Sequence, residues 1–221
     1  MPELRAYALS LSLDGYLAGP DQGPDAPLGV GGERLHAWVT ATGAWRDRHG
    51  LPEPGAADPV DERFAARGGG DEVGATIMGR NMFGPVRGPW RDASWRGWWG
   101  EEGPFGHPVL VLTHHAREDL VLGDGTRFRF VTGGPRAALD LAREAAGDRH
   151  VRVGGGAATV RQYLAAGLLD ELHLAVVPVL LGAGERLFAD DLGAAASGYE
   201  VVEHAPSSTV THMRLRRRAQ P

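Results

Sequence analysis

The segment VRVGGGAATVRQYL, residues 151–164, carries the strongest local signal for ligand binding. Its glycines, Gly154 to Gly156, stand between a run typical of a strand and a run typical of a helix. Such glycines let the backbone approach a ligand closely, and the free amides and dipole of the following helix attract phosphate. The same residues also fit a tight turn packed against a sheet. Because the G-x-G-x-x-G pattern is absent, a conventional Rossmann domain is disfavoured.

Two further segments place chemistry-bearing residues where a strand ends. In MGRNMF, Gly79 leaves the strand and Arg80 projects from a short helix, where a guanidinium can pair with phosphate through a bidentate fork. In LTHHAR, Thr113 and His114 follow an apolar strand, at the end where open α/β sheets bind ligands. A surface arginine beside a helix cap at Asn81, and solvated loop histidines, are the simpler alternatives.

All three segments set glycine or polar residues at the carboxyl end of a strand. A site for NAD would show a carboxylate at such an end, whereas histidine and arginine favour an additional phosphate. Together the segments predict a site for a phosphorylated dinucleotide.

The composition excludes several kinds of chemistry. The 221 residues include no Cys and no Lys, so all 23 basic residues are Arg. This excludes a Walker-type lysine, a Schiff-base lysine, a thiolate nucleophile, disulfides and Cys-ligated metal. No G-x-S-x-G or H-E-x-x-H motif occurs and the nine His lack ligand spacing, so no metal site is expected. A net charge of -5 gives no general attraction to nucleic acid or anionic membranes.

The length predicts one domain, residues 1–221, and the 43% hydrophobic and 23% charged residues are typical of a globular chain. We expect a cytoplasmic protein, because no signal peptide is recognisable and the longest apolar run, residues 174–181, is short and contains Pro178.

The first third of the chain alternates in character. Residues 4–13 predict a strand that ends at an Asp-Gly turn, and residues 21–32 predict a surface loop. Residues 33–46 have apolar side chains at helical spacing and predict one amphipathic helix. A loop-rich insertion is expected around residues 47–72, with a helical turn near residues 61–66.

Strand and helix patterns alternate regularly in the remainder. An apolar strand and a short helix meet at Gly79, and the last two strands form an antiparallel pair. This order predicts an α/β sandwich with a mostly parallel sheet and an antiparallel edge. The expected strands are 74–78, 108–113, 128–132, 150–153, 171–179, 199–204 and 209–215, and the expected long helices are 136–146 and 157–166.

Taken in order, SLSLDGYLAGP, GATIMGRNMFGP, PVLVLTHH and the block from VRVGGG to ERLF resemble the dihydrofolate reductase-like family. The resemblance is greatest to the branch related to the reductase domain of the bifunctional riboflavin biosynthesis protein, and it runs from about Arg5 to Leu215. It implies a three-layer α/β/α sandwich, an NADPH-dependent reductase acting on a small molecule, and commonly a homodimer.

The resemblance also implies the cofactor site. Gly79, Arg80 and Asn81 would meet the cofactor phosphates, with Thr113 and His114 near the adenosine 2′-phosphate. Residues lining the pyrophosphate and nicotinamide side would be Gly154, Gly155, Gly156, Ala157 and Thr159. Residues of the first strand and of the mobile loop over nicotinamide would be Ala8, Asp14, Leu17 and Ala18.

Two departures concern the substrate. Folate reductases carry an acidic residue shortly before an aromatic pair of the first helix, and alignment on Trp38 puts Leu35 there. The riboflavin enzyme has a Glu where this chain has Gly154, and it carries a zinc deaminase domain that a chain without Cys lacks. Neither substrate matches the sequence.

Hydride transfer also requires a proton, for which the candidate donors are Glu33, His36, Asp14 or a bound water. Glu33 and His36 lie one helical turn apart, and a solvated helix face is their simpler explanation.

Four tryptophans, Trp90, Trp95, Trp98 and Trp99, follow the MGRNMF helix. They predict either a wall for a flat aromatic substrate, or a satellite core or dimer contact. The basic tail, Arg214 and residues 216–218, predicts a solvated terminus.

The leading hypothesis is an NADPH-dependent reductase of a small heterocyclic or carbonyl compound. The alternatives are reduction of dihydrofolate or of the riboflavin pyrimidine intermediate, and a non-catalytic ligand-binding module.

Overall fold

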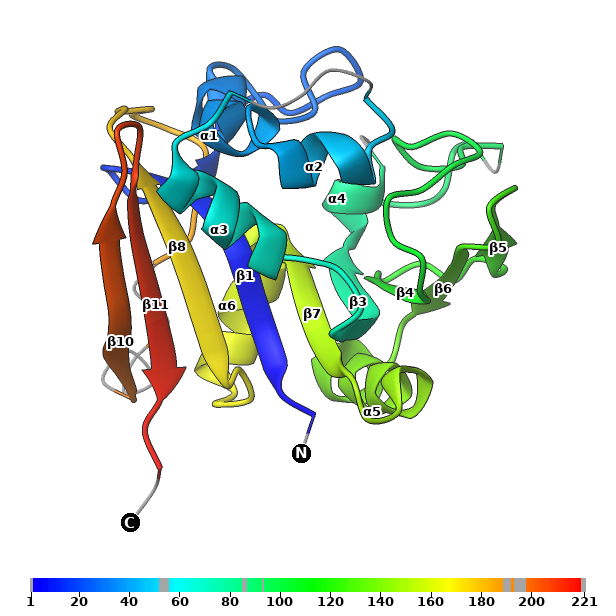
Figure 1. Cartoon of the computed structure of the whole chain (residues 1–221). Helices are drawn as coiled ribbons and strands as arrows, with labels where there is room; N and C mark the ends of the chain where they lie inside the picture. The colour runs from blue at the N-terminus through cyan, green and yellow to red at the C-terminus, as the bar shows by residue number, and fades with distance from the viewer. Residues whose placement is uncertain are drawn as a thin grey trace.

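The computed structural model describes residues 2–51, 56–84, 87–92, 94–188, 192 and 198–219. Within these ranges one nine-stranded sheet forms the centre of the molecule, in the order β10-β11-β8-β1-β7-β3-β4-β6-β5 (Figure 1). The six strands from β8 to β6 are parallel, whereas β10, β11 and β5 pair antiparallel. The predicted α/β fold, with a mostly parallel sheet and an antiparallel C-terminal edge, is confirmed.

The parallel strands are buried because helices cover both faces, which explains their continuous apolar runs. The sheet consists of β1 Leu4–Ser12, β3 Val73–Gly79, β4 Val109–Leu112, β5 Leu120–Val121, β6 Arg127–Val131, β7 His150–Gly155, β8 Glu171–Val177, β10 Tyr199–Pro206 and β11 Thr211–Arg217. Two short strands that the sequence pattern did not reveal, β2 Tyr16–Ala18 and β9 Glu185–Arg186, pair with each other.

Helices α5, Gly134–Ala146, and α6, Ala157–Ala165, pack behind the sheet in Figure 1. In front of it lie η1 Gly32–His36, α1 Ala37–Thr40, α2 Gly43–Arg48 and α3 Pro59–Arg67, and the short α4 Arg80–Phe83 follows β3. The larger core cluster lies between the sheet and α5 and α6, and a smaller one joins η1, α1 and α3 to the opposite face.

The single helix predicted for residues 33–46 is wrong, because the structure divides it into η1, α1 and α2. Thr42 accepts a hydrogen bond from the Trp45 amide and so caps a new helix. The Glu62 carboxylate, from α3, accepts hydrogen bonds from the next two amides at 2.7 and 2.8 Å. A partner about twenty residues away in the sequence therefore stabilises the break.

The insertion around residues 47–72 is more ordered than its Pro- and Gly-rich sequence predicts. Asp58 caps α3, a nine-residue helix that begins with Pro59. Phe64 and Ala65 of this helix are buried. Residues 52–55 of the insertion lie outside the described residues.

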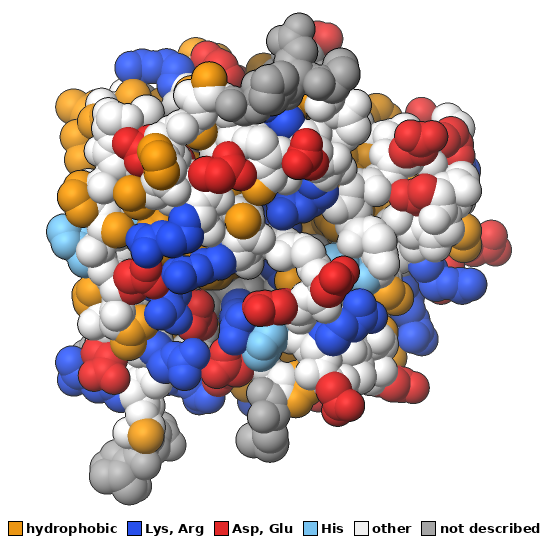
Figure 2. Space-filling model, viewed as in Figure 1, with side chains coloured by type: hydrophobic (Ala, Val, Ile, Leu, Met, Phe, Trp, Pro, Cys, Tyr) orange, Lys and Arg blue, Asp and Glu red, His pale blue; other side chains and the backbone are white. Residues whose placement is uncertain are grey.

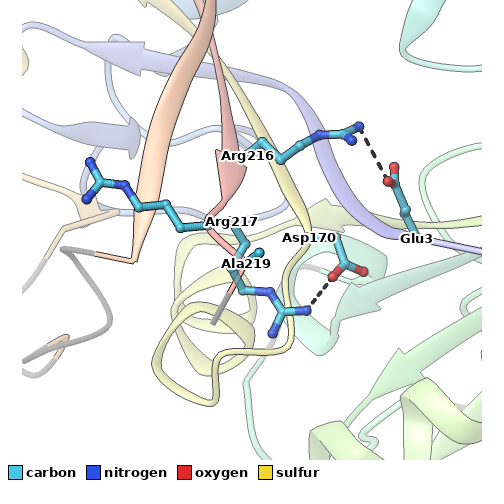
Figure 3. Close-up of a pocket in the computed structure, with 6 residues that line it drawn as sticks. Glu3, Asp170, Arg216, Arg217 and Ala219 are labelled. Atoms are coloured by element: carbon cyan, nitrogen blue, oxygen red, sulfur yellow. Dashed lines mark hydrogen bonds and ion pairs between the residues drawn. The ribbon is translucent and has the colours of Figure 1, made fainter. Parts of the chain in front are cut away.

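The basic tail is not simply a solvated terminus, because Arg214, Arg216 and Arg217 belong to β11 and are paired, whereas Arg218 follows the strand and is exposed. Arg214 lies 2.9 Å from the buried Glu171, and carboxylates alternate with arginines on this face (Figure 2). Figure 3 shows the end of the strand, where Arg216 pairs with Glu3 and Arg217 with Asp170. The charges are balanced locally, so they carry no argument for an anionic partner.

Protonation of histidines links the stability of the fold to pH. Burial is the main cause that lowers the pKa of His36, His49, His107, His150, His173 and His212. The unfolded chain takes up these protons below about pH 6.5, where the folded protein does not, so stability must fall as the pH falls.

We therefore expect the free energy of unfolding to decrease by about 1–3 kcal/mol from about pH 7 to about pH 5. Urea unfolding followed by tryptophan fluorescence measures the change. Equal or greater stability at the lower pH would contradict the assignment of neutral buried histidines.

Candidate active site

A cavity of about 910 Å³ opens at the carboxyl ends of β1, β7, β3 and β4. Open α/β sheets bind ligands at this edge, and the volume suits a large ligand. Of the residues predicted for the cofactor site, all but Asp14 line this cavity: Ala8, Leu17, Ala18, Gly79, Arg80, Asn81, Thr113, His114, Gly154, Gly155, Gly156, Ala157 and Thr159. The structure thus brings together segments far apart in sequence, and the role of each residue remains a prediction.

The two glycine turns meet because Gly79 has no side chain. A Cβ atom placed on Gly79 would lie 2.4 Å from Oγ1 of Thr159, in the first turn of α6. A side chain at this position would displace the Thr159 hydroxyl. Gly79 therefore lets the two helix starts that border the cavity approach each other closely.

Two of the three glycines belong to the strand itself, because β7 continues through Gly155. Gly155 has φ of +132°, a conformation that favours glycine, and the Gly155–Gly156 peptide bond is cis. α6 begins immediately afterwards, at Ala157. The first amides of a helix have no partner within the helix, so this turn offers donors to a ligand.

Arg80 carries a positive charge that no carboxylate pairs with among the described residues. Its guanidinium carbon lies 3.3 Å from the ring centroid of Trp90, and its buried Nε has no hydrogen-bond partner there. Burial, with a contribution from Arg117, lowers the pKa of Arg80 to about 10, so the group stays charged at neutral pH. A partly buried cation without a carboxylate partner is suited to an anionic ligand.

Trp90 connects Arg80 to the turn after β4. Its indole Nε1 donates to the carbonyl oxygen of His115 at 2.8 Å. The Thr113 hydroxyl donates to the same carbonyl and accepts from the His115 amide. Arg117 lies over the Trp90 ring at 4.9 Å and donates to the Trp95 carbonyl oxygen. The sequence singled out Trp90 only as one of a group, and it indicated Arg117 of LTHHAR as a residue that favours a phosphate. It did not indicate the contact between the two side chains.

Of the three candidate proton donors, only His36 lines the cavity. The Asp14 carboxylate accepts hydrogen bonds from the Ser12 hydroxyl and from the Leu181 and Gly182 amides. These bonds, led by that from Ser12, lower the pKa of Asp14 to about 2, so it holds a turn and retains no proton. Glu33 is exposed outside the cavity lining.

The neutral form of His36 fits its surroundings, because burial lowers its pKa. Its Nδ1 lies 3.3 Å from the Gly32 carbonyl oxygen, to which it donates in the neutral tautomer. Nε2 is then an acceptor. His36 can therefore accept a hydrogen bond from a ligand at neutral pH.

The tryptophan group divides between a satellite core and the lining of the cavity, and its contact with a substrate stays a prediction. Trp90, Trp95 and Trp99 pack against a third core cluster built on Phe83 and Phe128. Trp98 and Trp99 also line the cavity, as does Trp45 of α2. Trp45, which the sequence analysis did not select, was hidden because its helix was predicted as part of a longer one.

Two polar bridges join the segments that border the cavity. Asn81 of α4 donates to the side-chain oxygen of Gln22 at 3.1 Å. Arg87 pairs with Glu185 of β9. All four residues line the cavity, so the loop after β2 and strand β9 are tied to the α4 side.

Two other kinds of site find no support in the described part of the chain. No group of three or more His, Asp or Glu side chains there is arranged to hold a metal ion. No helix there is long and apolar enough to cross a membrane.

The contact between Gly79 and Thr159 is open to a direct test. Gly79→Ala should lower the free energy of unfolding by about 1–3 kcal/mol, because its Cβ would overlap the Thr159 hydroxyl. Adding Thr159→Ala removes that hydroxyl and should recover most of the loss in a double-mutant cycle. Gly156→Ala is the matched control, since its Cβ would meet nothing within 4 Å. Additive effects of the two changes would contradict the contact.

Comparisons with known proteins bear on the family and the fold. The chain matches the family model of the RibD C-terminal domain over residues 6–212. A protein of Shewanella sp. PV-4 named for riboflavin biosynthesis has a similar structure, with a TM-score of 0.62, 23% identity, and coverage of 99% of this chain and 100% of that chain. Dihydrofolate reductase from Enterococcus faecalis, solved with NADP(H) and RAB-propyl, has a TM-score of 0.51 and 13% identity, with coverage of 98% of this chain and 97% of that chain. No curated protein matches the chain.

At these identities the two structures show the fold alone, and they confirm the dihydrofolate reductase-like architecture. The family match is broader evidence, because it spans nearly the whole chain and includes all the turns that line the cavity. The chain therefore belongs to the RibD C-terminal domain family, and this membership supports a reductase-type role.

Proposed function

We propose that the protein is an NADPH-dependent reductase of a small heterocyclic or carbonyl compound. The observation that carries the proposal is Arg80, a partly buried cation without a carboxylate partner among the described residues, beside the glycine turn that precedes α6. Such a charge costs free energy in the isolated protein, and a phosphate ligand would offset that cost. The E. faecalis reductase, named with NADP(H), gives the same proposal a precedent within the fold.

The residues present fit the cofactor. Arg80 and Asn81 would hold its phosphates, Thr113 and His114 would lie near the 2′-phosphate, and the first turn of α6 would donate backbone amides. Asn81 Oδ1 is buried and lacks a partner among the described residues, so a donor on a ligand would satisfy it. When bound, NADPH supplies the hydride, and the protein supplies orientation and a dry cavity.

The substrate side of the cavity is aromatic and carries no unpaired carboxylate. Trp45, Trp98 and Trp99 offer flat apolar surfaces, and neutral His36 offers an acceptor. Leu35, at the position aligned with the acidic residue of folate reductases, is fully buried in the core. Reduction of a pterin is therefore less well supported than reduction of a neutral, flat compound.

Loss of the Arg80 charge tests the cofactor assignment. Arg80→Ala should weaken NADPH binding by about 1–3 kcal/mol, because a charge-assisted contact to phosphate is lost. Isothermal titration calorimetry measures the change. Arg143→Ala, an exposed residue of α5, is the control and should bind as the wild type does. Unchanged NADPH affinity in Arg80→Ala would contradict a contact between Arg80 and the cofactor phosphates.

Turnover separates the enzyme from a binding module. We expect the protein to oxidise NADPH in the presence of a flat heterocyclic or carbonyl substrate, and the loss of NADPH absorbance measures the rate. The rate should be lower in Trp98→Ala. Dihydrofolate and the riboflavin pyrimidine intermediate are tested in parallel as the alternative substrates. Quenching of tryptophan fluorescence by such compounds, without any oxidation of NADPH, would favour the binding module.

A further inference from the structure

Three buried polar side chains that do not line the cavity form a chain of hydrogen bonds. Asp61 of α3 lies 2.8 Å from Nε2 of His212 on β11. Nδ1 of His212 lies 3.1 Å from Nε2 of His173 on β8. Nδ1 of His173 accepts a hydrogen bond of 3.1 Å from the backbone amide of Ala8 on β1. The three side chains are at most 1% exposed.

The last of these bonds sets the direction of the others. Because the Ala8 amide donates to Nδ1, a neutral His173 has its proton on Nε2 and donates it to His212. His212 then has its own proton on Nε2 and donates it to Asp61. The second carboxylate oxygen of Asp61 accepts from the Thr209 hydroxyl at 2.6 Å. Every donor in the chain thus has one acceptor, and the charged end is satisfied.

The chain ends at an unusual point of the sheet. Ala8 has φ of +57°, a left-handed conformation that is uncommon for a residue with a side chain. The register of β1 against β8 shifts there, between Ala6 and Leu9, as in a β-bulge. The bulge turns the Ala8 amide away from the strand ladder and toward His173. Without that acceptor, the amide would be buried and unpaired.

This bulge forms part of the cavity floor. Ala8, Leu9 and Ser10 all line the cavity. Ala6 pairs with Val153, so the bulge lies level with the glycine turn that follows on β7. Ser10 is also held from behind, because its hydroxyl accepts from the Trp38 indole at 2.9 Å.

Packing holds the hydrogen-bonded chain rigid. The Phe64 ring stacks on both imidazoles, with centroid distances of 4.7 Å to His173 and 4.2 Å to His212. Trp38 meets His212 edge-on at 5.0 Å. Burying a carboxylate and two imidazoles costs desolvation energy that an apolar core would avoid. We therefore expect these groups to serve a purpose other than stability, namely to fix the geometry of the groups that they contact.

We propose that Asp61, His212 and His173 are positioning residues that hold the Ala8 bulge in the shape needed to receive the nicotinamide end of the cofactor. They act through the backbone amide of Ala8 and touch no ligand themselves. The inference rests on the proposed use of the cavity for NADPH, with nicotinamide beside Ala8 as the family resemblance implies. It adds that affinity for one half of the cofactor depends on side chains that do not line the cavity.

Two ligands separate this role from general stability. NADPH contains nicotinamide, and 2′-phospho-ADP-ribose has the same phosphates without it. His173→Leu should raise the Kd for NADPH by about tenfold, as an amide left unpaired would shift the bulge. It should leave the Kd for 2′-phospho-ADP-ribose within about twofold of the wild type. His173→Asn, which keeps an acceptor for the amide, should restore most of the NADPH affinity.

Tyr199→Phe is the control for loss of stability. It removes a hydrogen bond of 2.7 Å to the Leu169 carbonyl oxygen at the far edge of the sheet, and it should change neither Kd. Equal weakening of both ligands by His173→Leu, or no weakening, would overturn the inference alone. Absence of NADPH binding by the wild type would overturn the proposed function together with it.

A measurement without any ligand covers the case in which His173→Leu does not fold. In ¹⁵N NMR spectra of the wild-type protein, both histidines should be neutral with the proton on Nε2, and the Ala8 amide should exchange slowly. A proton on Nδ1 of His173, or rapid exchange at Ala8, would overturn the inference.

Discussion

The absence of a side chain at Gly79 is the constraint on which the cavity depends. It lets the end of β3 approach Thr159, with 2.4 Å between a hypothetical Cβ and the hydroxyl oxygen. Because of this approach, the start of α4 and the start of α6 lie side by side and border the same cavity. Arg80 projects from the first helix, and the amides of Ala157 and its neighbours come from the second. The sheet order β1-β7-β3-β4 then adds the bulge and the threonine turn on either side.

Much of the remaining structure keeps polar groups in place around this cavity. Trp90 holds both the Arg80 guanidinium and the turn at Thr113. On the other side, buried histidines hold the Ala8 amide. Both arrangements retain buried polar or charged groups that lower stability in exchange for defined geometry, which is typical of functional sites.

The sequence was sufficient to predict the order of the main strands and long helices along the chain and the segments that border the cavity, because strands and glycine turns have strong local patterns. The family resemblance implied the thirteen residues assigned to the cofactor, and their role stays a prediction. The sequence was not sufficient where a distant residue decides the local structure. Glu62 stabilises the break before α2. The Asp14 carboxylate accepts hydrogen bonds from the Ser12 hydroxyl and from two amides that are remote in the sequence. The bond between Asp61 and His212 joins residues 151 positions apart, so no window of sequence reveals it. Trp45 was not selected from the sequence because the break before α2 was not predicted.

The most direct test of the account is a crystal structure of the protein soaked with NADPH. The account predicts cofactor phosphates within hydrogen-bonding distance of Arg80 and of the first turn of α6, with nicotinamide against Ala8. It also predicts free space between nicotinamide and the tryptophans, which would define the size and polarity of the substrate. A cavity that stays empty at saturating NADPH, or a cofactor bound elsewhere on the surface, would contradict the account.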